Sequence, residues 1–497
     1  MSMTNRSQKD NRPSPVRKAT QMPGRFRLLL DNPRPTMTTR SLYILTRMSF
    51  SLFLIICLLI PVTFSVMLNN RMDGDSAKYK SIVSTSLERE HLRGPIYDRN
   101  GKLLAETLQN EDGTTQRQLY YTHSVAHVIG SQPDAYYGSE GAEVYFNQLL
   151  VGLKKKNIDA QRGDNVYLTI DVNLQELLYT LLQDHIGAGV LTNCKTGELL
   201  AMVSTPSYDP SVTNEEAEQL YQNGEYVNNA TAALTPGSVF KLVSAAVFAD
   251  NGIFPVLDND GGKYTFEGLG TIANYGDYYY TNVDIYKAIQ KSSNVWFSRA
   301  AYDLVTQKNM LAYTDGIEAL GIGSTIPTQF GTLVQSHGIT ENDRWELLQS
   351  SFGQGKLLLS PMYMNIFVSA AVTDGKMLVP YMLLRSIDPA NKTSEEGKPH
   401  KLGFTVSETA CEVIRKGMLQ AGDDYGLQWN NQPGSVYAKT GTAEVSDTRN
   451  NIWLTSSFPA EDPQYTLTMV QLDGLQLSGA LVDDIQTVID YLAATYE

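Results

Sequence analysis

The sequence predicts an α/β (α+β) protein in which helices cover a mainly antiparallel sheet, preceded by a smaller mixed α/β domain and one transmembrane helix. Helical apolar periods alternate with short strand patterns after residue 165, and several strand patterns follow one another near the C-terminus. A single run, Met48 to Leu68, is free of charge over 21 residues, which matches the length that a bilayer requires. The 497 residues, 42% of them apolar, are enough for two domains beyond such an anchor.

The run from Met48 to Leu68 is expected to be an uncleaved anchor. Pro61 is tolerated in a spanning helix, and no small-residue cleavage site follows the run. A buried core helix is the alternative, although such helices usually carry a polar face. Residues 1–47 carry ten basic side chains against Asp10 and Asp31, so we expect a cytoplasmic, disordered tail, with the rest of the chain outside the membrane. The basic residues are Arg6, Lys9, Arg12, Arg17, Lys18, Arg25, Arg27, Arg34, Arg40 and Arg47.

The charge of the exported part argues against nucleic-acid binding. The whole chain has a net charge of -13, and the basic tail contributes about +8, which leaves about −21 on the remainder. Cys57 lies in the predicted anchor, so only Cys194 and Cys411 are exported. One disulfide between them is conceivable, but a core of this size needs no covalent staple, and we expect two separate buried thiols.

Residues 69–165 are expected to form the N-terminal pedestal domain, and residues 166–497 the larger domain. Asn100-Gly101 predicts a hairpin turn between strands near Ile96 and Leu103. The larger domain begins with a strand over 166–170, followed by Asp171 as the N-cap of an amphipathic helix. The apolar stripe of that helix is Leu174, Leu177, Leu178, Leu181 and Leu182.

The later elements follow from the same signals. Strands are predicted over 189–191, 198–204, 435–438, 451–455 and 465–472, and helices over 236–250, 283–304, 407–419 and 480–494. Two stretches, 251–282 and 388–402, are expected to be rich in loops because they are dense in glycine, tyrosine and charged residues.

The first chemical signal is a serine and a lysine one helical turn apart. Thr235-Pro236-Gly237 precedes Ser238, and Lys241 follows three residues later, so the two side chains share one helix face. A lysine can take the proton of a serine hydroxyl if burial or a neighbouring cation lowers its pKa. Alone the pair would equally fit a capping serine beside a solvated lysine.

Two further motifs follow in order. Ser292-Ser293-Asn294 lies in a predicted helix. Lys-Thr-Gly occurs twice, at 195–197 and at 439–441. The first copy fits a tight turn between two strands and is interpreted as structural, whereas the second runs along a strand edge that could line a cleft.

The ordered triple is typical of penicillin-binding proteins and serine β-lactamases. The chain resembles a short class B penicillin-binding protein, a peptidoglycan D,D-transpeptidase, over nearly everything after the anchor. Further matches are the stretches 93–105, 127–130, 197–210, 353–355 and 360–361. Departures are Asn193-Cys194, where the family commonly has Asp-Pro, and Asn451-Ile452-Trp453-Leu454, which differs from the usual aromatic strand.

The resemblance implies a role for each motif residue. Ser238 would be the acyl-forming nucleophile, Lys241 its base, and Ser292 a proton relay. Asn294 would hold Lys241 and the donor amide. Lys439 and Thr440 would bind the terminal carboxylate of a D-Ala-D-Ala stem peptide, and Gly441 would let the backbone of this substrate-binding segment approach closely. The amides of Ser238 and Thr442 would form an oxyanion hole.

The resemblance also implies partners and excludes others. Stem peptides and β-lactam antibiotics would bind the cleft, and a membrane glycosyltransferase of the SEDS type would act beside the enzyme. No cofactor or metal is expected, because the histidines lack ligand spacing. The alternatives are a class D-like β-lactamase or D,D-carboxypeptidase, and a non-catalytic β-lactam sensor or scaffold of the division or elongation machinery. An anchor and a pedestal have little use in a secreted hydrolase.

Overall fold

A computed structural model of the chain describes residues 92–131, 140–152, 162–212, 214–340, 342–390, 392–446, 449–474 and 478–496. All of them belong to one compact unit, Ile82–Glu497. The predicted tail and the predicted span at 48–68 lie outside the described residues. Over the described ranges, no helix combines the length and the apolarity that crossing a membrane needs.

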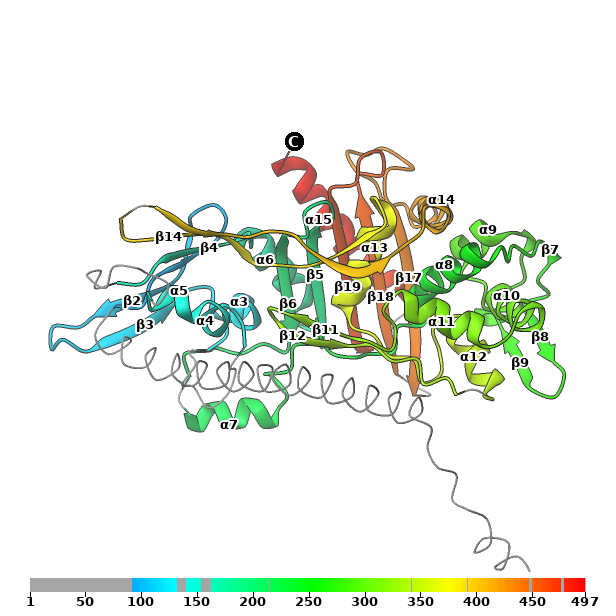
Figure 1. Cartoon of the computed structure of the whole chain (residues 1–497), viewed down its shortest axis with the longest axis horizontal. Coiled ribbons are helices and arrows are strands. Elements are labelled where there is room, and N and C mark those ends of the chain that lie inside the picture. The colour runs from blue at the N-terminus through cyan, green and yellow to red at the C-terminus, as the bar shows by residue number, and fades with distance from the viewer. Residues whose placement is uncertain are drawn as a thin grey trace, which may run out of the picture. The chain divides into compact units, whose positions relative to one another are not determined.

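A five-stranded antiparallel sheet forms the centre of this unit (Figure 1). Its strands, in spatial order, are β17 (Tyr437–Ser446), β18 (Arg449–Phe458), β19 (Tyr465–Gly474), β5 (Gly187–Asn193) and β6 (Leu199–Thr205). The strand β17, which contains the second Lys-Thr-Gly triplet, therefore lies at an edge of the sheet. An edge strand leaves one row of backbone groups unpaired, so a substrate can approach it.

Two helices cover one face of the sheet, α6 (Val172–Leu182) and α15 (Leu481–Thr495). Asp171 caps α6 by accepting from the backbone amides of Asn173 and Leu174, as its sequence position predicted. Leu178 of α6 and Ile489 of α15 pack into one apolar cluster with Leu191 and Leu454 of the sheet. The alternation of buried side chains along β5 and β18 thus divides the core into two clusters, one on each face.

The opposite face of the sheet carries two long helices and the turn and helix that hold the serine–lysine pair. These are α13 (Pro361–Val372), α14 (Glu408–Asp424), and the 3₁₀ turn η1 (Gly237–Phe240), which continues into α8 (Lys241–Asn251). Ser360 caps α13 and Pro361 occupies its first turn. Almost every side chain of α13 is buried, so this helix has no polar face. Its sequence therefore lacks the periodic signal of a surface helix.

A helical lobe extends from α8 (Figure 1). It consists of α9 (Ile285–Lys291), α10 (Asn294–Gln307), α11 (Leu311–Ala319) and α12 (Arg344–Ser350). Two pairs of short strands accompany these helices and the 3₁₀ turn η2 (Tyr275–Asp277): β7 (Leu257–Asn259) with β10 (Thr281–Val283), and β8 (Lys263–Phe266) with β9 (Gly270–Ala273). Two further pairs are β11 (Thr325–Thr328) with β12 (Gly331–Val334), and β13 (Lys376–Val379) with β16 (His400–Thr405), the latter packed on α13. Outside the lobe, the 3₁₀ turn η3 (Ser478–Ala480) precedes α15 and contacts β17, and the helix α7 (Asn214–Gln222) lies apart (Figure 1).

A second, mixed sheet contains the N-terminal strands. Its order is β15 (Thr393–Glu396), β14 (Leu383–Ile387), β4 (Asn165–Leu168), β1 (Ile96–Tyr97), β2 (Leu103–Gln109) and β3 (Thr115–Leu119). The helices α3 (Thr122–Ile129), α4 (Ala142–Tyr145) and α5 (Asn147–Leu150) accompany it. Because β14 and β15 come from the C-terminal half, this sheet draws on both sides of residue 165, and the domain division there stays a prediction.

The hairpin at Asn100-Gly101 is confirmed. β1 pairs with β2 in antiparallel register, and Gly101 has a φ of +85°, which glycine adopts easily. The carboxylate of Asp98 accepts from the amides of Asn100 and Lys102 at 2.9 and 2.7 Å. The buried carboxylate of Glu143 forms ion pairs with two arginines, Arg93 Nε at 2.6 Å and Arg117 Nε at 2.8 Å. The stretch that begins at Arg93 therefore contributes a buried ion pair beside the N-terminal sheet.

One sequence prediction needs correction. The single helix expected over 283–304 is wrong, because Val283 ends β10 and a break at Ser292 separates α9 from α10. Ser292 has a left-handed φ of +58°, and the side chain of Ser293 then caps α10. The stretches 251–282 and 388–402, expected to be rich in loops, also contain short strands: β7 to β9 and the start of β10 in the first, and β15 and the start of β16 in the second. Cys194 and Cys411 are both free and buried, as expected of two separate thiols.

Candidate active site

The site lies where three chain segments meet against the edge strand β17. Ser238 occupies the 3₁₀ turn η1, Lys241 begins α8, and Lys241 Nζ lies 2.5 Å from Ser238 Oγ. The spacing of three residues places both side chains on one face, as the sequence indicated. Ser238 is half-buried, whereas Lys241 has no exposed surface.

The break between α9 and α10 brings the second motif to the same lysine. Lys241 Nζ lies 2.8 Å from Asn294 Oδ1 and 3.3 Å from Ser292 Oγ. Asn294 also donates to the carbonyl of Ala273 at 2.9 Å, which fixes the orientation of its amide. A left-handed serine costs about 1–3 kcal/mol, and such backbone strain persists where surrounding contacts hold it.

Buried polar groups supply those contacts. Asp260 accepts from Ser293 Oγ at 2.8 Å, from Asn274 Nδ2 at 2.8 Å and from the amide of Tyr280 at 2.8 Å. Asn274 Oδ1 accepts in turn from the amide of Val295 at 3.1 Å. This network holds in place the residues directly after Ser292, where α10 begins. The sequence analysis missed Asp260 and Asn274, because their turn-rich segment carries no signal of contact with a helix break.

The strand β17 brings the third motif. Lys439 Nζ lies 3.1 Å from Ser292 Oγ and 2.9 Å from the carbonyl of Thr440. The hydroxyl of Ser292 therefore stands between the two lysine nitrogens. Thr440 Oγ1 shares a hydrogen bond of 2.7 Å with the hydroxyl of Tyr425, a residue of the site that the sequence analysis missed.

Glycines allow η1 and β17 to approach each other closely. A Cβ built on Gly237 would meet the carbonyl group of Thr442 at 2.6 Å, and one built on Gly441 would meet the carbonyl oxygen of Pro236 at 2.9 Å. Gly353, with a φ of +94°, packs so tightly on Gly237 that a Cβ there would overlap the carbonyl oxygen. The backbone of Thr442 consequently lies beside the turn that carries Ser238.

Burial and mutual repulsion govern the charges of the two lysines. Burial lowers the pKa of Lys241 well below its ordinary value, and the nearby charge of Lys439 lowers it further. Burial also lowers the pKa of Lys439, to about 7. The rings of Phe352 and Phe297 flank Lys241 Nζ at 5.7 and 5.9 Å from their centroids and exclude water from it. An uncharged Lys241 amine in contact with Ser238 is the arrangement that can remove a hydroxyl proton.

The three segments line one cleft of about 690 Å³. Its lining includes Ser238, Ser292, Asn294, Thr440 and Thr442, whereas Lys241 and Lys439 lie behind this wall. The first Lys-Thr-Gly triplet is not part of it. Lys195 is exposed and pairs with Asp462 at 2.5 Å, and Gly197 forms the tight turn between β5 and β6.

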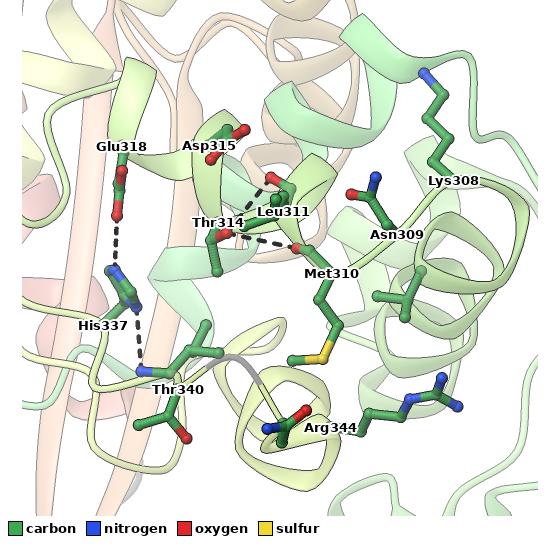
Figure 2. A pocket seen from close by; sticks show the side chains of 13 residues that line it. Lys308, Asn309, Met310, Leu311, Thr314, Asp315, Glu318, His337, Thr340 and Arg344 are labelled. Atoms are coloured by element: carbon green, nitrogen blue, oxygen red, sulfur yellow. Dashed lines mark hydrogen bonds and ion pairs between the residues drawn. The ribbon is translucent and has the colours of Figure 1, made fainter. Parts of the chain in front are cut away.

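A larger hollow of about 840 Å³ lies between α10, α11 and the segment before α12 (Figure 2). Its wall includes Met310, Thr314 and Arg344, and on one side His337 contacts Glu318 at 3.1 Å. Its lining contains no serine, and no lysine of it touches a nucleophile. We therefore assign the chemistry to the cleft at Ser238.

Comparison with known proteins indicates the family of the chain. The sequence profile described as "Penicillin binding protein transpeptidase domain" matches residues 187–485, which is more than half of the chain. Penicillin-binding protein 3 of Bacillus subtilis is 27% identical over 340 residues, or 63% of this chain and 47% of that protein. Peptidoglycan D,D-transpeptidase MrdA of Salmonella typhimurium is 23% identical over 431 residues, or 76% of this chain and 68% of that protein.

Solved structures have the same fold. The D,D-transpeptidase domain of a peptidoglycan glycosyltransferase from Eggerthella lenta superposes with a TM-score of 0.72 at 24% identity, covering 82% of this chain and 99% of that one. A ceftriaxone acyl-enzyme complex of penicillin-binding protein A from M. tuberculosis superposes with a TM-score of 0.72 at 23% identity, with the same coverage. With the profile spanning the central sheet and all three motifs, the chain belongs to the penicillin-binding protein transpeptidase family.

Proposed function

We propose that this protein is a peptidoglycan D,D-transpeptidase that forms an acyl-enzyme on Ser238 and is inhibited by β-lactams. The observation that carries the proposal is the buried Lys241 amine, placed 2.5 Å from Ser238 Oγ and 2.8 Å from Asn294. The relatives named D,D-transpeptidases support the reaction class.

In the first step, Lys241 Nζ takes the proton from Ser238 Oγ as the oxygen attacks the carbonyl carbon of the penultimate D-Ala. The amides of Ser238 and Thr442 stabilise the oxyanion, a contribution of roughly 2.7–4 kcal/mol for each donor in related chemistry. Ser292 passes the proton to the departing D-Ala nitrogen, the C–N bond breaks, and an ester remains on Ser238. Asn294 orients Lys241 and the donor amide throughout.

Lys439 and Thr440 bind the terminal carboxylate of the donor. In the second step, an amine of a neighbouring stem peptide attacks the ester and restores Ser238. The strand edge at β17 supports this assignment, because an extended peptide can lie along unpaired backbone groups. The reaction, as written, requires no metal or cofactor.

The proposal extends to location and partners. Residues 48–68 would anchor the enzyme as a single span with residues 1–47 in the cytoplasm, and residues 69–165 would form a pedestal below the transpeptidase domain, 166–497. A membrane glycosyltransferase of the SEDS type would supply glycan strands. The support for the anchor is the uncharged run and the basic residues before it.

A labelled penicillin tests the nucleophile. The full chain should be marked covalently, Ser238→Ala should stay unmarked, and the exposed control Ser211→Ala should be marked like the unaltered protein. Equal labelling of Ser238→Ala would exclude the assignment. Rapid hydrolysis of penicillin would favour the β-lactamase alternative. Release of D-Ala without crosslinks would favour the carboxypeptidase. A full chain that penicillin does not label would favour the non-catalytic sensor or scaffold.

A further inference from the structure

The edge strand β17 continues beyond the Lys-Thr-Gly triplet and places one more charged side chain at the cleft. Along this strand Lys439, Gly441 and Ala443 are buried, Thr440 and Thr442 are half-buried, and Glu444 is exposed. Alternate residues of a strand face the same side, so Glu444 follows Thr440 and Thr442 on the open face. All three line the cleft of Ser238.

Glu444 stands opposite Asn450 of β18, which also lines the cleft. Its Cα lies about 7 Å beyond that of Thr442, two residues of strand rise. The cleft is lined by one other carboxylate, Asp424, which pairs with Lys291 at 2.6 Å. The backbone of Glu444 is paired in the sheet, but within the described part of the chain its carboxylate takes part in no ion pair or hydrogen bond. Among the described residues, the cleft wall therefore carries one carboxylate that has no paired cation.

The negative charge of Glu444 does not favour binding of the donor peptide. Its terminal group is a carboxylate, which Lys439 attracts and Glu444 repels. The second step, however, needs an amine, and a lysine-like amine with a pKa near 10.4 is an ammonium ion in neutral water. A carboxylate at the open end of the cleft attracts this ion and raises its concentration beside the ester.

We propose that Glu444 is the acceptor-binding residue, which holds the ammonium of the incoming stem peptide before it attacks. This inference rests on the proposed function and names the acceptor class, a primary amine that is cationic in solution. The ammonium first releases one proton to solvent. The free amine then attacks the ester carbon, a C–N bond forms, the bond from carbon to Ser238 Oγ breaks, and Lys241 returns a proton from the amine to Oγ.

The test compares two acceptors on the full chain in detergent, with a D-alanyl thioester as donor. Nα-acetyl-lysinamide is a cationic amine, and hydroxylamine is uncharged at neutral pH. An exposed ion pair changes affinity by up to about fivefold. For Glu444→Gln, we therefore expect the KM for Nα-acetyl-lysinamide to rise about three- to fivefold, while kcat and the transfer to hydroxylamine change by less than about twofold. Glu444→Lys should raise that KM further.

The salt dependence of KM and a control variant test whether the effect is electrostatic and local to Glu444. Added salt should reduce the difference between the unaltered protein and Glu444→Gln, because an exposed charge is screened. The control is Glu461→Gln, an exposed carboxylate in the turn between β18 and β19, at the far end of β18 from Asn450. It should leave both acceptors unaffected.

Penicillin acylation distinguishes a failure of the proposed function from a failure of the role proposed for Glu444. Labelling of Glu444→Gln shows that the variant is folded and that the donor step operates; failure of the unaltered chain to label would instead refute the proposed function. If labelling persists and the KM for Nα-acetyl-lysinamide is unchanged, or if both acceptors lose transfer equally, the role of Glu444 is refuted.

Discussion

Replacement of Lys439 by glutamine should move the pH dependence of acylation upward. Lys241 and Lys439 both contact Ser292 Oγ, at 3.3 and 3.1 Å, so their nitrogens are no more than about 6.4 Å apart. At an effective dielectric constant of about 20, two positive charges at that separation repel each other by about 2.6 kcal/mol. A repulsion of this size favours the uncharged form of Lys241.

The sign follows from the role of each group. The charge of Lys439 disfavours protonation of Lys241 and so lowers its pKa; without that charge the pKa rises. Lys241 acts as a base only when uncharged, so the acidic limb of the acylation profile should shift to higher pH in Lys439→Gln. The unaltered protein should also lose activity at high pH as Lys439 deprotonates, with its pKa of about 7, and this alkaline limb should vanish in the variant.

The measurement is the second-order rate constant of acylation by a fluorescent penicillin between about pH 4 and 10, which reports groups of the free enzyme. The variant should also be slower at every pH, because it loses the partner of the substrate carboxylate; only the midpoint of the limb tests the repulsion. Lys195→Gln is the matched control, since Lys195 begins the other Lys-Thr-Gly triplet and is exposed. An acidic limb in Lys439→Gln within about half a unit of the original would refute the electrostatic argument.

Two further variants test the walls of the site. Gly353→Ala would place a Cβ against the carbonyl of Gly237. We expect this overlap to lower the free energy of unfolding, measured by chemical denaturation, by more than about 2 kcal/mol. Gly403→Ala is the control and should not lower it, because nothing lies within 4 Å of its new Cβ. Asp260→Ala would leave buried donors around Ser293 unpaired, at about 1–3 kcal/mol each, and should slow penicillin acylation about tenfold as the Ser292 turn loosens. The exposed neighbour Asp258 provides its control, and equal acylation by Asp258→Ala and Asp260→Ala would contradict the role of the network.

Many of the helices and strands could be predicted from the sequence, because N-caps and apolar periodicity are signals between residues close in the chain. The N-cap position of Asp171 predicts the start of α6, and the spacing of Ile485, Val488 and Ile489 predicts the apolar face of α15. Family resemblance gave the order of the motifs, and the position of Lys439 on a strand edge favoured it over Lys195. These signals all involve residues close in the chain.

The features that were missed depend on contacts between distant residues. The five residues between Ile289 and Val295 include no glycine or proline, so no strong local signal marks a helix break at Ser292. The break forms because Asp260 and Asn274, more than a dozen residues upstream, satisfy the freed polar groups of that turn. Tertiary contacts here set a break that no strong local signal marks, which happens most often where a functional group must be aimed.

The same reasoning explains why this site needs rigid surroundings. Two fully buried lysines stabilise the fold poorly, because each loses hydration and each repels the other. In the unfolded chain both would bind protons up to about pH 10.4, so the folded state loses stability as the pH falls from there to their lowered pKa values, and loses no more below them. Contacts elsewhere must offset this cost, and the close backbone approach at Gly237, Gly353 and Gly441 prevents the lysines from relaxing into water. The reactivity proposed for Ser238 therefore depends as much on those glycines as on the charged groups themselves.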